Sequence, residues 1–291
     1  RNVTGVQTCT LPICQFFSEF ARQNNQPPHA GGFADQPLVL NRMFGPDGLR
    51  SQGARVSWLL PTPFYTEAML GVMNSAGGTT WSFRSDESTA IHGGAPISRE
   101  VKSPGDLLYV PRVASSLDLT DNQVLLVGAS GAFGPNSGGA ASRSEVYGLD
   151  AYWKWKSSTA HQGFPFVSLQ GEYLSRRYDV DQRSATDDRA PGALPAATLT
   201  DDGAYAQVLW GIVPRVVVGL RGEYVKAGSS AFVSPERADR NRWSPNVTWY
   251  PSEFSKLRLQ YNYDDRPGIG RDHSVWVQFE FLLGAHAAHK F

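Results

Sequence analysis

The chain has 291 residues, a length at which an all-β barrel commonly forms a single domain. Lys plus Arg and Asp plus Glu are both 27, so the net charge is zero and we expect no nucleic-acid partner. Aromatic residues reach 12%, charged residues only 19%, and no apolar run approaches the roughly 18 residues of a transmembrane helix. This composition fits a membrane β-barrel, and it also fits a soluble β-sandwich.

The first residues do not read as part of the fold. Residues 3–13, VTGVQTCTLPI, resemble the translation of a DNA-sequencing adapter. We therefore expect residues 1–14 to be an artefact of a metagenomic fragment, and residues 15–291 to be an N-terminally truncated barrel domain. The alternative is an ordinary polar terminus. Both cysteines, Cys9 and Cys14, fall in this stretch, so residues 15–291 offer no disulfide and no Cys-ligated metal site.

Alternation of apolar and polar residues predicts about twelve strands. It is clearest where Leu257, Leu259 and Tyr261 interleave with Lys256 and Arg258. In chain order the predicted strands are 15–22, 54–60, 64–73, 106–119, 123–133, 147–156, 164–178, 203–212, 215–224, 242–250, 256–263 and 275–283. Their apolar faces are rich in Val, Leu, Tyr and Trp, whereas the opposite faces carry charge.

The connections between these strands alternate in length. Short ones at 61–63, 121–122, 157–163, 213–214 and 251–253 alternate with long polar segments at 74–105, 134–144, 179–202, 228–241 and 265–272. Tight turns on one side and long loops on the other are typical of up-and-down membrane barrels. The sequence therefore predicts an all-β, antiparallel, up-and-down transmembrane β-barrel of the bacterial outer membrane, in contact with lipid. Aromatic residues near the strand ends predict a girdle at each interface.

Five stretches carry a resemblance to a known family. They are 16–25 (FFSEFARQNN), 36–50 (QPLVLNRMFGPDGLR), 53–68 (GARVSWLLPTPFYTEA), 242–264 (RWSPNVTWYPSEFSKLRLQYNYD) and 273–291 (HSVWVQFEFLLGAHAAHKF). They resemble Gram-negative outer-membrane proteins labelled zinc-regulated, TonB-dependent outer-membrane receptors, which are also filed as porin-like. The resemblance implies uptake of a zinc-related substrate and TonB as a partner. No stretch resembles a globular plug domain or a TonB-contacting segment.

The end of the chain resembles the insertion signal of outer-membrane barrels, which the barrel-insertion machinery reads. Phe279, Phe281 and the terminal Phe291 carry this resemblance. The alternation stops at Leu283, so residues 284–290 depart from the simplest form of the signal.

Charged residues on the polar strand faces are the candidates for lining a lumen. They are Lys154, Lys156, Glu172, Arg176, Arg215, Arg221, Glu223, Lys256, Arg258 and Glu280. The excess of basic residues predicts a mixed-charge wall that mildly favours anions. The alternative is a set of salt bridges that only hold the lumen in shape.

Two histidines near the end of the chain are the candidate metal ligands. His286 and His289 lie on one side of the tail if it is helical and on opposite faces if it is a strand. Zinc would need further ligands from elsewhere, and the alternative is a polar tail that plugs the barrel end. We expect no cofactor other than zinc as a transported or regulatory ion.

No sequence motif of a hydrolase, zinc protease or nucleotide-binding enzyme is present, so we expect no enzyme. The sequence predicts passage of a small solute through a charged lumen gated by long loops. Two alternatives stay open: the barrel of a TonB-dependent receptor, and a closed adhesion barrel that acts through its outer loops.

Overall fold

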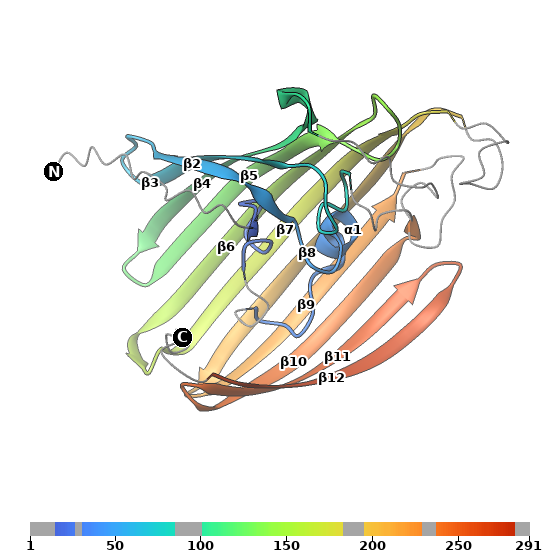
Figure 1. Cartoon of the computed structure of the whole chain (residues 1–291). Helices are drawn as coiled ribbons and strands as arrows, with labels where there is room; N and C mark the ends of the chain where they lie inside the picture. The colour runs from blue at the N-terminus through green and yellow to red at the C-terminus, as the bar shows by residue number, and fades with distance from the viewer. Residues whose placement is uncertain (1–14, 27–30, 85–100, 183–194, 229–236, 283–291) are drawn as a thin grey trace.

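The computed structural model describes residues 15–26, 31–84, 101–182, 195–228 and 237–282. Within these ranges the chain forms one antiparallel sheet of twelve strands, each paired with its neighbours in sequence (Figure 1). The strands are β1 (Gln15–Phe17), β2 (Arg50–Leu59), β3 (Tyr65–Asn74), β4 (Leu107–Thr120), β5 (Gln123–Pro135), β6 (Arg143–His161), β7 (Phe164–Val180), β8 (Ala197–Val213), β9 (Val216–Ala227), β10 (Arg240–Ser252), β11 (Ser255–Arg266) and β12 (Gly270–Phe281). This confirms the prediction of an all-β, up-and-down antiparallel fold.

Several details differ from the prediction. The first strand ends at Phe17 because the following residues turn into the fold. The segment 265–272 is not a long loop, because β11 and β12 pair as far as Arg266 and Gly270 and leave a tight turn. Gly268 and Gly270 have φ of 82° and 138° there, values that favour glycine. A helix that the alternation did not indicate, α1 (Leu38–Phe44), follows β1.

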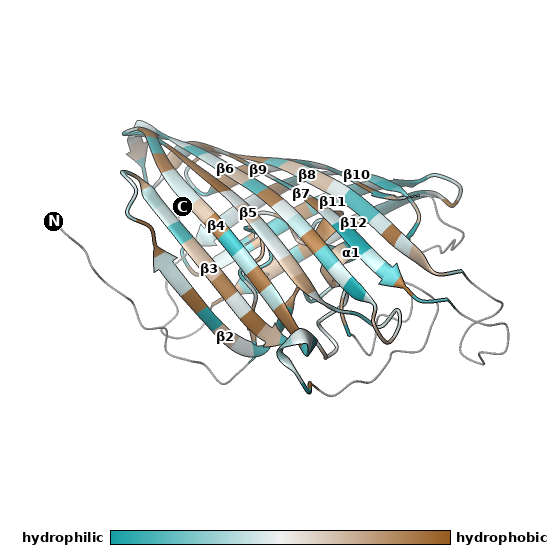
Figure 2. Ribbon diagram, turned by 90° about the horizontal axis from the view of Figure 1, so that it is seen from above, coloured by the Kyte–Doolittle hydropathy of each residue, from teal (hydrophilic) through white to brown (hydrophobic). Residues whose placement is uncertain are grey.

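The sheet is strongly curved, and its two faces differ in chemistry. Burial follows period 2 along β7, where every second residue is buried from Phe164 to Val180. The convex face is exposed and mainly apolar at mid-strand; Leu149, Leu220 and Leu259 are 59%, 44% and 51% exposed. Figure 2 shows apolar and polar residues alternating along the strands. A contiguous exposed apolar surface of this extent is typical of contact with lipid or a partner.

Residues 18–26 and 31–49, here called the internal segment, lie inside the curve of the sheet (Figure 1). The segment includes α1, which contacts β7, β8 and β9. Phe20, Met43 and Phe44 are almost completely buried, and the Phe20 and Phe44 rings meet edge to face at 4.9 Å. The segment and the concave face together form the main apolar cluster of the described residues.

Both edges of the described sheet remain partly unpaired. Among the described residues, β12 pairs with β11 alone, and β2 pairs with β1 only at Arg50, Ser51 and Gln52. The sheet is therefore not closed by the strands described. No helix in the described ranges is long and apolar enough to cross a membrane.

Candidate functional site

The concave face holds a carboxylate at the meeting point of three strands. Asp35 of the internal segment accepts hydrogen bonds on Oδ1 from Arg221 of β9 at 2.6 Å and from Gln260 of β11 at 2.7 Å. Its Oδ2 faces Arg242 of β10 at 2.9 Å and accepts from Asn262 of β11 at 3.2 Å. Each oxygen thus faces one guanidinium group and accepts a hydrogen bond from one amide.

A second carboxylate holds these donors in position. Glu223 Oε1 lies 2.9 Å from Arg221 Nε and 2.7 Å from Arg242 Nε. Burial alone would raise the pKa of Asp35, but the charges of Arg221 and Arg242 outweigh it and hold the pKa of that carboxyl below its usual value. Asp35 is therefore ionised at neutral pH.

A second charged cluster surrounds Asp201 of β8, close to α1. Its carboxylate lies 3.2 Å from Arg42, 2.6 Å from Arg176 and 3.3 Å from Arg237. All four side chains are at most 8% exposed. Arg176 also donates to the Arg42 carbonyl and to Ser82. This cluster joins α1 to β7 and β8.

Side chains of the concave face of the sheet, here called the wall, also bind the backbone of the internal segment. Glu172 of β7 accepts hydrogen bonds from the backbone N–H groups of Arg22 and Gln23, at 3.0 and 2.7 Å. Arg258 of β11 donates to the Gly31 carbonyl at 2.9 Å. Polar contacts with the wall therefore add to the apolar packing that holds the internal segment.

The ten residues predicted to line a lumen occupy three kinds of position. Glu172, Arg176, Arg221, Glu223, Lys256 and Arg258 are buried on the concave face. Lys154 and Glu280 are half-buried and Lys156 is exposed, all three on strands. Lys256 pairs with Glu280 at 3.0 Å. Arg215 lies exposed in the turn between β8 and β9.

The sequence interpretation missed important partners of these residues. Asp35 and Arg42 precede β2, in a stretch with no strand alternation. Arg242, Asp201 and Arg112 share the parity of buried positions on their strands, so the period-2 pattern could have found them. Arg112 forms a bidentate pair with Asp150, at 2.6 and 2.9 Å. The concave face is thus largely charge-paired in this conformation.

The remaining predicted sites lie near the end of the chain. His286, His289 and Phe291 fall outside the described residues. Phe279 and Phe281 are exposed on β12. Among the described residues, no group of three or more His, Cys, Asp or Glu side chains could hold a metal ion.

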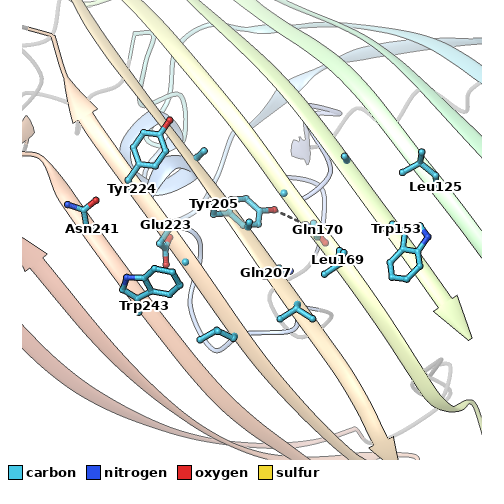
Figure 3. A pocket seen from close by; sticks show the side chains of 17 residues that line it. Leu125, Trp153, Leu169, Gln170, Tyr205, Gln207, Glu223, Tyr224, Asn241 and Trp243 are labelled. Atoms are coloured by element: carbon cyan, nitrogen blue, oxygen red, sulfur yellow. Dashed lines mark hydrogen bonds between the residues drawn. The ribbon is translucent and has the colours of Figure 1, made fainter.

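The convex face carries exposed aromatic residues and an open hollow. Tyr173 of β7 is opposite Ala204 of β8, which in turn is opposite Tyr224 of β9. The hollow has a volume of about 750 Å³ and is floored by small residues such as Ala204 and Gly222. Trp153 and Trp243 stand at its two ends (Figure 3).

Comparisons with known proteins give distant likenesses, and no family model matches the chain. A protein of Aquifex aeolicus (strain VF5), described as uncharacterized, is 30% identical over 308 aligned residues, which include 97% of this chain. The chain spans 60% of that relative's length.

Two solved structures are also similar to this chain. One is the siderophore receptor PirA from Acinetobacter baumannii, with 11% identity, a TM-score of 0.46, and coverage of 81% of this chain and 38% of that one. The other is the Pseudomonas putida toluene transporter TodX, with 12% identity, a TM-score of 0.31, and coverage of 80% and 76%. Likenesses this weak assign no function.

Proposed function

We propose that this chain forms a β-barrel of the bacterial outer membrane and passes a small solute through a lumen gated by the internal segment. The observation that carries the proposal is the contrast between the two faces of the sheet. The convex face is apolar and exposed, whereas the concave face is charged and holds the internal segment. A membrane barrel needs this arrangement, with lipid outside and polar groups inside.

The strands are long enough for this role. From β4 to β12 they have 12 to 19 residues, more than the roughly 9–11 that a tilted transmembrane strand requires. Charged residues of the convex face, such as Arg177, Asp202 and Lys226, lie towards the strand ends that lead into the long connections. Residues 15–291 would then form one barrel domain, embedded through the barrel-insertion machinery. Closure in the membrane requires partners for the edges of β2 and β12.

The internal segment supports a gated passage. It is anchored by ion pairs and hydrogen bonds, such as Asp35 with Arg221, which a charged solute can replace. Lumen-lining roles follow for the buried wall residues Glu172, Arg176, Arg221, Glu223, Lys256 and Arg258. Lys154, Lys156 and Glu280 would lie nearer the openings or the sheet edge.

Two finer proposals concern the energy source and the cargo. The gate is compatible with passive, porin-like flux and with a TonB-driven receptor, in which TonB would displace the internal segment. Zinc is retained as a candidate cargo from the family resemblance, with His286 and His289 as its candidate ligands. The rival is the closed adhesion barrel, favoured by the extensive charge pairing of the concave face.

Single-channel recording on the full-length protein in planar bilayers tests the proposal. We expect intermittent current, which becomes more frequent in Phe44→Ala because the internal segment loses a buried anchor. A parallel recording with Zn²⁺ tests the zinc assignment through a change in current. Absence of current from both proteins, with insertion verified, would contradict passive transport and leave the TonB-driven receptor or the closed adhesion barrel.

A further inference from the structure

We propose that the donors around Asp35 form a carboxylate-binding site, which a carboxylate-bearing solute occupies when the internal segment moves away. This inference rests on the proposed transport function and names its substrate class. In the present conformation, Asp35 occupies the site as an internal substitute for the solute.

The geometry of the donors is specific for a carboxylate. Arg221 and Gln260 serve one oxygen at 2.6 and 2.7 Å, and Arg242 and Asn262 face the other at 2.9 and 3.2 Å. Two guanidinium groups and two amides from neighbouring strands thus meet both oxygens of one planar group. Charge-assisted bonds of this kind are the strong ones, and guanidinium groups match carboxylate geometry well.

The wall keeps these donors in place independently of Asp35. Glu223 binds Nε of both Arg221 and Arg242. One terminal nitrogen of each arginine then faces the Asp35 carboxylate, and the other donates to a backbone carbonyl of the internal segment, that of Asp35 or Gln36. Gln260 also donates to Asn262 at 2.9 Å. The donors therefore need little rearrangement to accept another carboxylate, and preorganisation favours affinity.

The local charge sets the class of solute. Arg221 and Arg242 carry two positive charges, and Glu223 supplies one negative charge. Asp35 cancels the remaining positive charge when it is in place. Its departure leaves one uncompensated positive charge in a mostly buried region, which is costly unless an anion replaces it. The site is therefore matched to one carboxylate group rather than to a cation.

Binding of succinate to the full-length protein in detergent micelles, measured by calorimetry, tests the site. We expect Asp35→Asn to bind succinate about tenfold more tightly than the wild type, because the competing charge-assisted bonds are lost. Asp265→Asn is the matched control, since the same change falls on a partly exposed carboxylate at the end of β11. Succinamide, which lacks the charge, is expected to bind neither protein.

Two further variants locate the binding. In the Asp35→Asn background, Arg242→Gln should abolish the tenfold gain, and Asn262→Ala should reduce it without changing any charge. If Arg242→Gln does not fold, the Asn262→Ala variant still tests the location. Equal succinate affinity in the wild type and Asp35→Asn, a gain that survives both wall substitutions, or binding of succinamide would each overturn the proposal.

Bilayer recording separates this inference from the transport proposal. Current that succinate does not inhibit in Asp35→Asn, together with no succinate binding, overturns the carboxylate site and leaves transport standing. Succinate binding that follows the expected variant pattern, without current from any inserted variant, keeps the site and contradicts passive transport.

Discussion

The ring of Phe20 lies so close over Gly148 that a Cβ atom at position 148 would come within 2.8 Å of it. A Cβ atom at Gly203 would come within 3.0 Å of Val39, although Tyr224 O and Val225 on the neighbouring strand would be nearer, at 2.6 and 2.8 Å. Both glycines belong to strands of the wall, and Phe20 and Val39 belong to the internal segment. The absence of side chains at these two wall positions makes room for the internal segment.

Adding one methyl group at this contact should weaken the docking of the internal segment. We expect Gly148→Ala to lower the free energy of unfolding by about 1–3 kcal/mol, the usual cost of overpacking. Gly71→Ala is the control, because its Cβ would meet its nearest neighbour at an ordinary 3.5 Å. Urea titration followed by tryptophan fluorescence measures both. Equal effects of the two substitutions would contradict the close contact.

Removing a buried ring should loosen the same segment. Phe44 is 1% exposed and packs against Phe20, so Phe44→Ala should cost about 3–5 kcal/mol through lost contacts and a residual cavity. Hydrogen exchange is expected to increase across residues 31–49 more than in β7. Exchange that increases uniformly over the sheet would instead indicate that the internal segment and the wall unfold as one unit.

The buried pair of Arg112 and Asp150 makes a prediction about charge. Arg112→Gln leaves the Asp150 carboxylate buried without its cation, at an expected cost of about 3–5 kcal/mol. The double variant Arg112→Gln with Asp150→Asn should recover much of this loss, because no isolated charge remains. Both are compared by urea unfolding. Failure of the second substitution to recover stability would show that shape, not charge, determines the cost.

Asp106, just before β4, gives a pH dependence outside the strands. Hydrogen bonds from the Arg84 guanidinium and the Ser103 hydroxyl hold the pKa of the Asp106 carboxyl well below its usual range. Its contribution is therefore fully present above the unfolded pKa of about 3.9 and is lost as the pH falls through the folded value.

Local amide protection checks this dependence. The backbone N–H groups of Lys102 and Ser103 both donate to Asp106, so their protection factors should fall as the pH drops below about 4. In Asp106→Asn the protection should be low already at neutral pH and vary little. Asp121→Asn, in an exposed turn, is the control and should behave as the wild type does. Unchanged protection in Asp106→Asn would contradict the assignment.

Quenching of tryptophan fluorescence by lipid tests whether the convex face contacts the membrane. Trp243 is 56% exposed beside the outer hollow, whereas Trp81 packs against a buried cluster. In liposomes that contain brominated lipid, Trp243→Phe should remove a larger part of the quenched fluorescence than Trp81→Phe. The opposite order would place the concave side, not the convex side, against lipid.

The strands were predictable because each one carries its own signal. In β7 and β11 the side chains alternate between exposed and buried positions, and this alternation appears directly in the sequence. The short helix α1 was missed because five of its seven residues are buried, which leaves no amphipathic pattern. Pro37 before it and Gly45 after it were the available signals.

The candidate site was only partly predictable for a different reason. Arg221 and Glu223 follow from strand parity, but their partner Asp35 is 186 residues away from Arg221 in the chain. No local pattern links positions so distant. The ion pairs and the location of the internal segment therefore required the three-dimensional structure.

The long sequence distance between the internal segment and the wall also has a consequence for folding order. Neighbouring strands pair through short connections such as Asp121 and Asn122, whereas the contact of Asp35 with Arg221 requires closure of a very long loop. Local pairings carry a smaller entropy cost and form faster. We therefore expect the sheet to assemble first and the internal segment to dock last. During assembly the chain would pass through a state in which the carboxylate-binding site is already built but Asp35 has not yet entered it.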